Sequence, residues 1–349
     1  MPRTKPTIFL GFSGGVDSAV AAILLQKDFS VLGIFFEFWR EKKITDFFRN
    51  FQQKNRVKKL AAAVGIPIEF FPARQIFSQK VVGKFLTEFA AGRTPNPCVF
   101  CNRDVKIELL AKIAATEKNA KFATGHFAQT VSGKLFRGLD LEKDQSLFLC
   151  RVAKKNLKNL VLPLGKFSKK KVWEIAAAAN LTKFLPKSES RDLCFLRGKL
   201  SRFLQKNLPE KFFTPGNFID SSGEVLGTHR GILNFTVGQR ARLSGQNEAL
   251  FVGGIDLEKN EVKLISPAEL FVRQIFLRSC QFFRRPRDGA EVFAQTRHRG
   301  GLYRGKIHFG ENKKMAKIIF EGPVRRTAPG QIVAIFSEKN EVVGSGIFC

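Results

Sequence analysis

The sequence predicts an α/β protein with a Rossmann-like N-terminal domain on a parallel sheet, a small β-rich central domain and a C-terminal β-barrel. Apolar strand-like runs alternate with helical segments up to about residue 200, a pattern typical of a parallel sheet covered by helices. Beyond about residue 205, short β-type runs are separated by Gly, Pro, Asn and Ser, as in all-β domains. We place the three domains at 1–203, 204–270 and 271–349.

The first domain is expected to open with a buried strand, Thr7–Leu10, followed by a Gly-rich turn and an Ala-rich helix over Ala19–Leu25. Ligands of open parallel sheets bind at the carboxyl ends of the strands, so this turn already lies where a site is expected. A basic segment from Glu41 to Val64 is partly helical in pattern. Further strands and helices are predicted at Val31–Phe36, Gly65–Phe71, Val105–Ala115 and Lys121–His126.

The second half of the chain is expected to contain only short strands and turns. The last run contains glycines that indicate a bend or a bulge. Together these runs favour a small β domain followed by a barrel rather than a continuation of the parallel sheet. The strand-like runs are Gly216–Asp220, Glu224–Gly227, Phe251–Asp256, Glu261–Ile265 and Val342–Phe348.

The turn after the first strand has the features of an anion-binding loop. Its glycines allow close backbone approach to an anion, and the start of the helix adds partial positive charge. The common nucleoside-triphosphate loop carries a Lys, whereas this turn has none and places Asp17 near the start of the helix. These features suit pyrophosphate, with Asp17 available for Mg²⁺. The residues of the turn are Gly11, Phe12, Ser13, Gly14, Gly15, Val16, Asp17 and Ser18.

The net charge of +29 favours a polyanionic partner, with nucleic acid as the first candidate. A compositional bias is the competing explanation for part of this charge, because the chain has 37 Phe but only 1 Tyr. We find no apolar run long enough for a membrane span and no secretory signal, so a cytoplasmic protein without a membrane partner is expected. In that compartment the 6 cysteines favour catalysis, metal binding or burial over a disulfide framework.

Cys98 and Cys101 form a Cys-x-x-Cys pair after two prolines that are expected to hold an extended segment. We expect a helix to begin at Asn102, which would place Cys101 near a helix N-terminus and lower its thiol pKa. Half of a zinc site, a redox pair and a nucleophile with a neighbour are the three interpretations, although the chain has no second Cys-x-x-Cys for a four-ligand zinc site. Cys194, flanked by apolar residues, would by itself be interpreted as a buried core cysteine.

Several short motifs occur in one order along the chain. Together they resemble the tRNA-specific 2-thiouridylase (MnmA) family of the PP-loop ATP pyrophosphatases, and the resemblance runs nearly end to end. It implies an adenine nucleotide alpha hydrolase-like fold for the first domain. The motifs are Ser13–Ser18, Thr94–Cys98, Cys101–Asn102, Ala123–His126, Lys143–Ser146, Glu189–Ser190, Cys194–Phe195, Thr236–Arg240, Thr327–Gln331 and Gly344–Ile347.

The resemblance implies a reaction in which ATP, with Mg²⁺, adenylates the C2 oxygen of the wobble uridine in the anticodon arm of tRNA and releases pyrophosphate. Sulfur from a cysteine persulfide then displaces AMP and yields 2-thiouridine. By position, Cys101 matches the nucleophile and Cys194 the persulfide carrier, and the release of sulfur leaves a disulfide between them. Asp17 joins them as a catalytic residue. A cysteine desulfurase or a relay protein would supply the persulfide.

The resemblance also assigns binding residues. Phe36 and Gly125 match contacts to the nucleotide, and Asn96, Pro97 and Cys98 match contacts to the target base. His126 matches a tRNA contact, although a hydrogen-bonded structural histidine at a strand end is the alternative. The other positions that match tRNA contacts are Lys143, Asp144, Gln145, Arg297, His298 and Gln331.

Cys98 stands where many family members have Asp, so it adds a third thiol to the site. Cys98, Cys101 and Cys194 together form a candidate ligand set for an iron–sulfur cluster. Two other functions are kept as alternatives. One is a different PP-loop adenylating ligase or amidotransferase-type enzyme, which needs no thiol pair. The other is a tRNA-binding protein that retains the ATP loop without catalysis.

Overall fold

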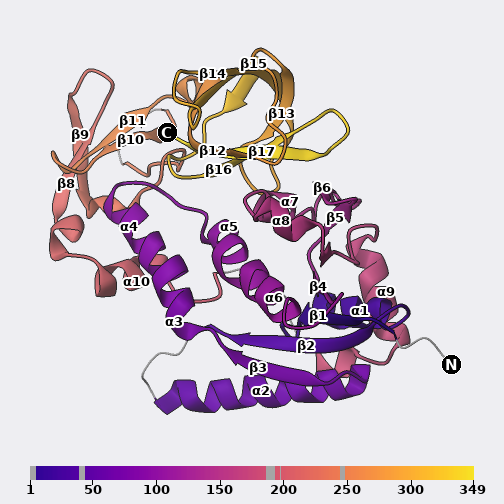
Figure 1. The fold of residues 1–349 in the computed structure, drawn as a ribbon. Helices are drawn as coiled ribbons and strands as arrows, with labels where there is room; N and C mark the ends of the chain where they lie inside the picture. The colour runs from indigo at the N-terminus through magenta and orange to yellow at the C-terminus, as the bar shows by residue number, and fades with distance from the viewer. Residues whose placement is uncertain (1–4, 39–43, 186–192, 197, 244–247) are drawn as a thin grey trace. The chain divides into compact units, whose positions relative to one another are not determined.

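The computed structural model of the 349-residue chain divides into two compact units (Figure 1). Unit 1 contains Met1–Val81, Cys98–Phe195 and Lys339–Val342, and unit 2 contains Val82–Pro97, Leu196–Glu338 and Val343–Cys349. Each unit therefore combines segments that lie far apart in the sequence. The structure describes residues 5–38, 44–185, 193–196, 198–243 and 248–349, with only the backbone for 44–50.

Unit 1 is built on a five-stranded parallel sheet. Its strands are β1 (Thr7–Gly11), β2 (Ser30–Glu37), β3 (Ile68–Pro72), β4 (Lys121–Thr124) and β7 (Leu160–Val161). Their order is β3-β2-β1-β4-β7, so β1 pairs with β2 on one side and with β4 on the other. The direction in which the chain adds strands reverses beside β1. This is the position at which open α/β sheets bind their ligands.

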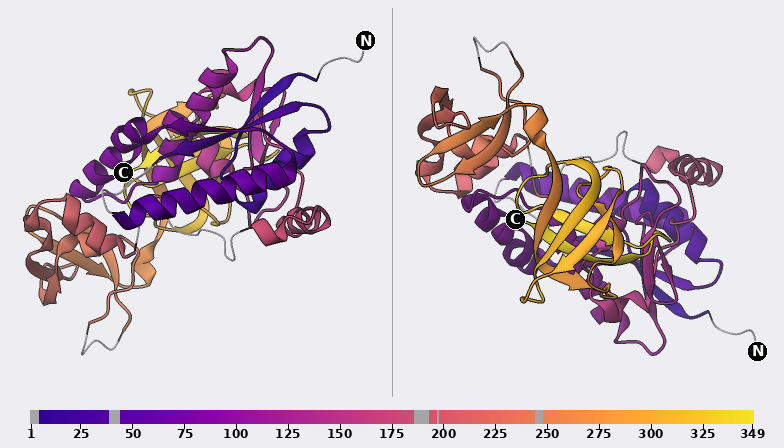
Figure 2. Two further views of the ribbon diagram at one scale, coloured as in Figure 1. Left: turned by 90° about the horizontal axis from the view of Figure 1, so that it is seen from below. Right: turned by 90° about the horizontal axis from the view of Figure 1, so that it is seen from above.

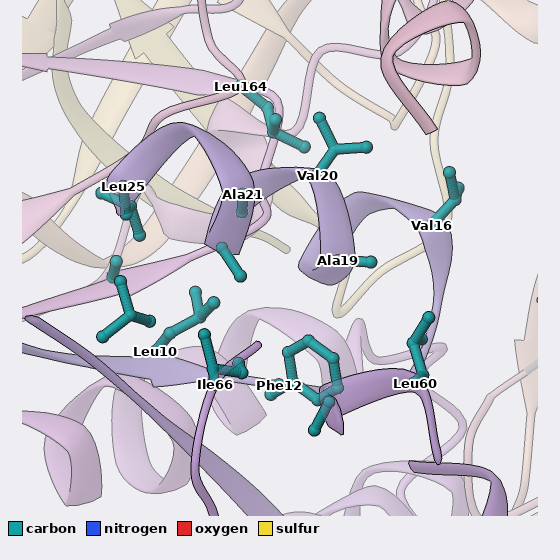
Figure 3. Close-up of a cluster of buried hydrophobic side chains, with 14 of the residues drawn as sticks. Leu10, Phe12, Val16, Ala19, Val20, Ala21, Leu25, Leu60, Ile66 and Leu164 are labelled. Atoms are coloured by element: carbon teal, nitrogen blue, oxygen red, sulfur yellow. The ribbon is translucent and has the colours of Figure 1, made fainter. Parts of the chain in front are cut away.

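Four helices form the larger helical part of unit 1: α1 (Val16–Leu25), α2 (Ile44–Val64), α6 (Ile107–Ala114) and α9 (Lys169–Ala178). Helix α1 contacts α2 and α9, whereas α6 contacts β1 and β4. The alanines of α1 are fully buried, and their small side chains let the helix approach its neighbours closely. The surrounding core, shown in Figure 3, includes Leu10, Phe12, Val20, Leu60, Ile66 and Leu164.

The remaining elements of unit 1, and the helices of unit 2, are short. A hairpin of β5 (Ala128–Val131) and β6 (Lys134–Arg137) follows β4. Two π-helical segments interrupt the helical regions, at η1 (Ser78–Gly83) and η2 (Asn102–Lys106). The remaining short α-helices are α3 (Arg74–Phe77), α4 (Lys84–Ala90), α5 (Pro97–Cys101), α7 (Ser146–Leu149), α8 (Lys154–Leu157) and α10 (Leu200–Asn207).

Unit 2 contains a four-stranded sheet and a closed barrel. The strands of the barrel are drawn in orange and yellow in Figure 2. The sheet consists of β8 (Pro215–Ile219), β9 (Val225–Arg230), β10 (Phe251–Asp256) and β11 (Glu261–Ile265), in the order β10-β11-β8-β9. The barrel consists of β12 (Phe271–Phe282), β13 (Glu291–Gln295), β14 (Tyr303–Phe309), β15 (Ala316–Arg325), β16 (Ile332–Phe336) and β17 (Val342–Phe348), in the order β12-β15-β14-β13-β16-β17. Closure leaves the barrel without a free sheet edge.

The structure confirms the predicted fold class: a parallel α/β sheet, a small β-rich domain and a C-terminal β-barrel. The predicted first domain, 1–203, includes Val82–Pro97, whereas in the structure this segment belongs to unit 2. No helix within the described ranges combines the length and the hydrophobicity that crossing a lipid bilayer requires.

Candidate active site

The Gly-rich turn connects the end of β1 at Gly11 with the start of α1 at Val16. Gly14 has a φ of +79°, and a Cβ atom there would lie 2.7 Å from the Cγ2 atom of Val57. Glycine is therefore required at this position both by the backbone conformation and by the lack of space. The N-cap residue of α1 is Gly15, which has no side chain to occupy the first amides of the helix. These amides and the positive end of the helix are available to an anion.

Hydroxyl groups hold the turn in shape. The Ser18 hydroxyl donates to the carbonyl oxygen of Gly15 at 2.9 Å, and the Ser13 and Ser18 hydroxyls lie 3.4 Å apart. Ser18 is buried, so its hydroxyl stabilises the turn from the inside.

Asp17 forms an ion pair with a lysine that the sequence analysis missed. The Nζ atom of Lys169, in the first turn of α9, lies 2.6 Å from Oδ1 of Asp17. The two residues are 152 positions apart, and Lys169 stands in a run of three lysines. No spacing rule distinguishes one member of such a run, so only the packing of α9 against α1 identifies it.

A pocket of about 320 Å³ lies in unit 1 beside the ends of β1, β2 and β4. Pockets of this size hold small-molecule ligands in proteins. Its walls contain most of the predicted nucleotide residues, without Gly14, Gly15 and Val16, together with Cys194, one of the two predicted sulfur-transfer residues. The lining includes Gly11, Phe12, Ser13, Asp17, Ser18, Phe36, Phe38, Lys106, Thr124, Gly125, His126, Gln145 and Cys194.

A larger pocket of about 1080 Å³ lies within unit 2 and is lined in part by Arg230, Arg240 and Arg242. It contains no cysteine and none of the Gly-rich turn. The smaller pocket, which is lined by the Gly-rich turn and by Cys194, is therefore the candidate active site.

Gly125 and His126 lie where β4 meets the start of α1. A Cβ atom on Gly125 would lie 2.9 Å from the carbonyl carbon of Asp17 and 3.1 Å from the amide nitrogen of Ser18, so glycine allows the two backbones to approach. The Nδ1 atom of His126 shares a hydrogen bond with the Thr124 hydroxyl at 2.7 Å. Burial, with a smaller contribution from Lys106, lowers the pKa of His126 to about 3. His126 therefore presents a neutral imidazole to the pocket at physiological pH.

The helix that carries Cys101 begins earlier than predicted. α5 starts at Pro97 and continues directly into η2, so the chain is already helical before Asn102. Proline suits the first position of a helix because the amide that it lacks has no partner there. Cys101 is buried, and burial raises its pKa to about 12. The prediction that a helix N-terminus lowers the pKa of Cys101 is therefore wrong.

Cys98, Cys101 and Cys194 share one positively charged neighbour, Lys106. Burial raises the pKa of all three thiols, and the charge of Lys106 opposes that rise. Burial also lowers the pKa of Lys106, but the three cysteines outweigh this effect and the net shift is upward. Lys106, which the sequence analysis missed, therefore stays charged and favours thiolate formation at each cysteine.

The predicted sulfur carrier is not a core residue. The Cys194 side chain is exposed and lines the pocket, whereas its neighbour Phe195 is buried and contacts the ring of Phe77. The surrounding protein still desolvates the thiol enough to raise its pKa. The motif residues Glu189 and Ser190 lie outside the described residues.

The side chains present fit one of the two inorganic groups that the sequence suggests. Asp17 offers a one-third-exposed carboxylate on the pocket wall, which fits Mg²⁺, since this ion binds through one or two carboxylates together with substrate phosphates. Within the part of the chain that the structure describes, no three His, Cys, Asp or Glu side chains are grouped to hold a metal ion. The three cysteines do not fit an iron–sulfur cluster as they are arranged, and we derive no step through one.

The Lys143–Gln145 segment forms a tightly tied loop. Asp144 is buried, and its carboxylate accepts from the Gly138 amide at 2.9 Å and from the Ser146 hydroxyl at 2.8 Å. Gln145 accepts from the Phe127 amide at 3.0 Å and also lines the pocket. The hydrogen bonds that the buried Asp144 carboxylate accepts therefore stabilise the conformation of the loop.

The remaining predicted tRNA residues lie in unit 2. The Gln331 side chain donates to the carbonyl oxygen of Thr94 at 2.6 Å, and the Thr94 amide donates to Pro329 at 2.8 Å. Two hydrogen bonds of Thr94 therefore connect the predicted target-base segment, which includes Asn96, to the turn before β16. Arg297 is exposed and His298 half-buried in the loop after β13.

Comparison with protein families matches three consecutive models to the chain. They are described as a tRNA methyl transferase HUP domain over residues 6–198, a tRNA methyl transferase PRC-barrel domain over 201–266 and an aminomethyltransferase beta-barrel domain over 272–348. The tRNA-specific 2-thiouridylase MnmA of Carboxydothermus hydrogenoformans is 34% identical over 359 residues, covering 98% of this chain and 97% of that protein. The chain belongs to the tRNA-specific 2-thiouridylase family.

Other 2-thiouridylases are similarly close. The MnmA protein of Chlamydia pneumoniae is 32% identical over 356 residues, covering 98% of this chain and 97% of that protein. Among solved structures, the U34-tRNA thiolase NcsA of Methanococcus maripaludis with its 4Fe–4S cluster has a TM-score of 0.35 and 21% identity, covering 55% of this chain and 61% of that one. This structural likeness is too weak to support any inference about the site.

Proposed function

We propose that the protein is an ATP-dependent tRNA-uridine 2-sulfurtransferase that converts the wobble uridine to 2-thiouridine. One observation carries the proposal: the pocket of about 320 Å³ is lined both by the pyrophosphate-type turn and by Cys194. A ligase that uses the same turn needs no thiol beside its nucleotide. Membership in the 2-thiouridylase family supports tRNA as the substrate, and the net charge of +29 suits its phosphates.

The first step activates the base. The C2 oxygen of the uridine attacks the α-phosphorus of ATP, and the bond to the bridging oxygen breaks, so pyrophosphate leaves with the electron pair. In this proposal, the amides at the start of α1 and the Ser13 hydroxyl bind these phosphates, which is supported by the glycine N-cap of α1 and by the position of Ser13 on the pocket wall. Mg²⁺, held through Asp17, would supply positive charge to the phosphates. The wobble base must leave the anticodon stack to reach the pocket.

The second step transfers sulfur. The Cys101 thiolate attacks the Sγ atom of a Cys194 persulfide and expels hydrosulfide, which attacks C2 of the adenylated base and displaces AMP. A Cys101–Cys194 disulfide remains, and an external thiol reductant must reduce it before the next turnover. Lys106 supports this step because its charge favours the thiolate forms.

The decisive experiment incubates the protein with unmodified tRNA, ATP, Mg²⁺ and a persulfide donor, such as a cysteine desulfurase with cysteine. Nucleoside mass spectrometry should detect 2-thiouridine, and a coupled assay should detect pyrophosphate. Pyrophosphate release without any 2-thiouridine would instead indicate another adenylating enzyme. Binding of tRNA without either product would indicate a non-catalytic tRNA-binding protein.

The iron–sulfur cluster is tested separately. Anaerobically purified protein is analysed for iron and acid-labile sulfide, and its thiolation activity is measured on the same sample. Full activity without either element would exclude the cluster. Activity that rises in proportion to bound iron would instead support Cys98, Cys101 and Cys194 as cluster ligands, in a side-chain arrangement different from the present one.

A further inference from the structure

The pyrophosphate-type turn lacks the lysine that other triphosphate loops carry within their own sequence. The amides at a helix start supply only about half of a positive charge. The phosphates of ATP bring several negative charges, so a site of this kind gains from a further cation. Lys169, from the distant helix α9, places an ammonium group 2.6 Å from the first-turn carboxylate of Asp17.

The base of the Lys169 side chain is held in place. Lys169 is the first residue of α9, and its amide donates to Oδ2 of Asp140 at 2.8 Å. The preceding residue, Ser168, caps the helix by accepting from the Lys171 amide at 3.2 Å. These bonds fix the direction in which α9 presents its first side chain.

The ammonium group of Lys169 lies in a nearly buried position, with a side-chain exposure of 11%. Removing an ammonium from water is costly unless an opposite charge or a π face replaces the solvent. Asp17 provides the opposite charge, and the ring of Phe127 lies 5.5 Å from Nζ. Asp17 stands in the first turn of α1 and lines the pocket, so the ion pair holds the Lys169 ammonium against a carboxylate of the pocket wall.

We propose that Lys169 is the phosphate-binding lysine of this site, supplied by α9 instead of by the turn. This inference rests on the proposed function, since it takes ATP as the ligand of the turn. Without nucleotide, Asp17 holds the Lys169 ammonium beside the turn. When Mg²⁺ and ATP bind, the Asp17 carboxylate would coordinate the metal ion, and the Lys169 ammonium would bind the two phosphates that leave as pyrophosphate. The flexible four-carbon stem of lysine allows this exchange of partners.

The test compares ATP with AMP, because AMP lacks the phosphates that Lys169 would bind. Binding of each nucleotide to the full-length Lys169→Met variant is measured by isothermal titration calorimetry in the presence of Mg²⁺. We expect the Kd for ATP to rise about 10- to 100-fold, as for loss of one charged hydrogen bond, and the Kd for AMP to change less than about 3-fold. Lys169→Arg should restore most of the ATP affinity, since it keeps the charge.

Lys171→Met is the matched control, because Lys171 lies on the same helix, is exposed and pairs with Glu174. It should bind both nucleotides like the wild type. Equal losses for ATP and AMP in Lys169→Met would indicate a purely structural role and overturn the proposal, as would unchanged ATP binding. If Lys169→Met does not fold, an ATP affinity of Lys169→Gln equal to that of Lys169→Arg would overturn it. Wild-type protein that makes no 2-thiouridine would refute the proposed function without affecting the ATP–AMP comparison.

Discussion

The candidate site has a nucleotide end, formed by the Gly-rich turn, and a cysteine end, formed by Cys98, Cys101 and Cys194, of which Cys194 lines the pocket. The two ends are prepared for their chemistry to different degrees. At the nucleotide end, backbone geometry alone forms the turn proposed to bind phosphate, and Gly14 and Gly125 adopt positions that only glycine fits. At the cysteine end, all three thiols have raised pKa values, so they are protonated at neutral pH. In the proposed mechanism, adenylation therefore depends on a preformed backbone, whereas sulfur transfer depends on charges that favour the thiolate, the minor protonation state.

The largest expected effect separates the two ends completely. Cys194→Ala should abolish 2-thiouridine formation because no residue can then carry the sulfur, while tRNA-dependent pyrophosphate release continues at the cysteine-independent end. Mass spectrometry of the tRNA and a pyrophosphate assay measure the two products. Cys349→Ala, which removes an exposed cysteine at the C-terminus, serves as the control. Full thiolation by Cys194→Ala would disprove the assignment of the sulfur carrier.

A change in the backbone turn should affect both steps. Gly14→Ala introduces a Cβ at a positive φ and 2.7 Å from Val57, so the turn must shift. Misplacement of the phosphates by this change should lower both pyrophosphate release and thiolation about 100-fold. Initial rates at saturating tRNA measure both.

The control for this substitution is Gly310→Ala, where a Cβ meets no atom within 4 Å. It should leave both rates near those of the wild type. Selective loss of thiolation in Gly14→Ala would contradict a role of the turn in adenylation.

A smaller effect is expected at the cysteine end when its counter-charge is removed. Lys106→Met should lower thiolation about 30-fold, because the thiolates lose the charge that favours them, and should change pyrophosphate release far less. Single-turnover measurements with preformed Cys194 persulfide isolate the sulfur step. Lys106→Arg keeps the charge and should recover part of the rate. Equal losses in both steps would show that Lys106 serves the nucleotide as well.

The smallest predicted change is a pH dependence that differs between the ends. The pKa of Cys101 is about 12, so its thiolate fraction, and with it the single-turnover sulfur step, should rise about tenfold from pH 7 to pH 8. A thiol loses its proton as the pH increases, so the thiolate fraction of Cys101 grows in this direction. Pyrophosphate release should stay nearly constant over the same range. A sulfur step that is independent of pH would indicate that Cys101 is already a thiolate when persulfide is bound.

The sequence predicted much of the fold because its signals are local. A strand, a Gly-rich turn and an Ala-rich helix follow one another within Thr7–Leu25, and each can be recognised from its own residues. The start of the Cys101 helix was misplaced for a local reason as well. Pro97 was taken to extend the chain, although proline is equally suited to the first position of a helix.

By itself, the sequence determined the class of the fold, and it identified the turn proposed to bind phosphate and the two cysteines at the centre of the proposed chemistry, Cys101 and Cys194. Only the tertiary structure selected Lys106 and Lys169 from the 59 Lys and Arg residues of the chain. The physical reason is that charge acts through space: a lysine favours a thiolate or binds a phosphate only if packing brings it there. Segments separated by 152 residues meet at Asp17, and no sequence spacing records that contact.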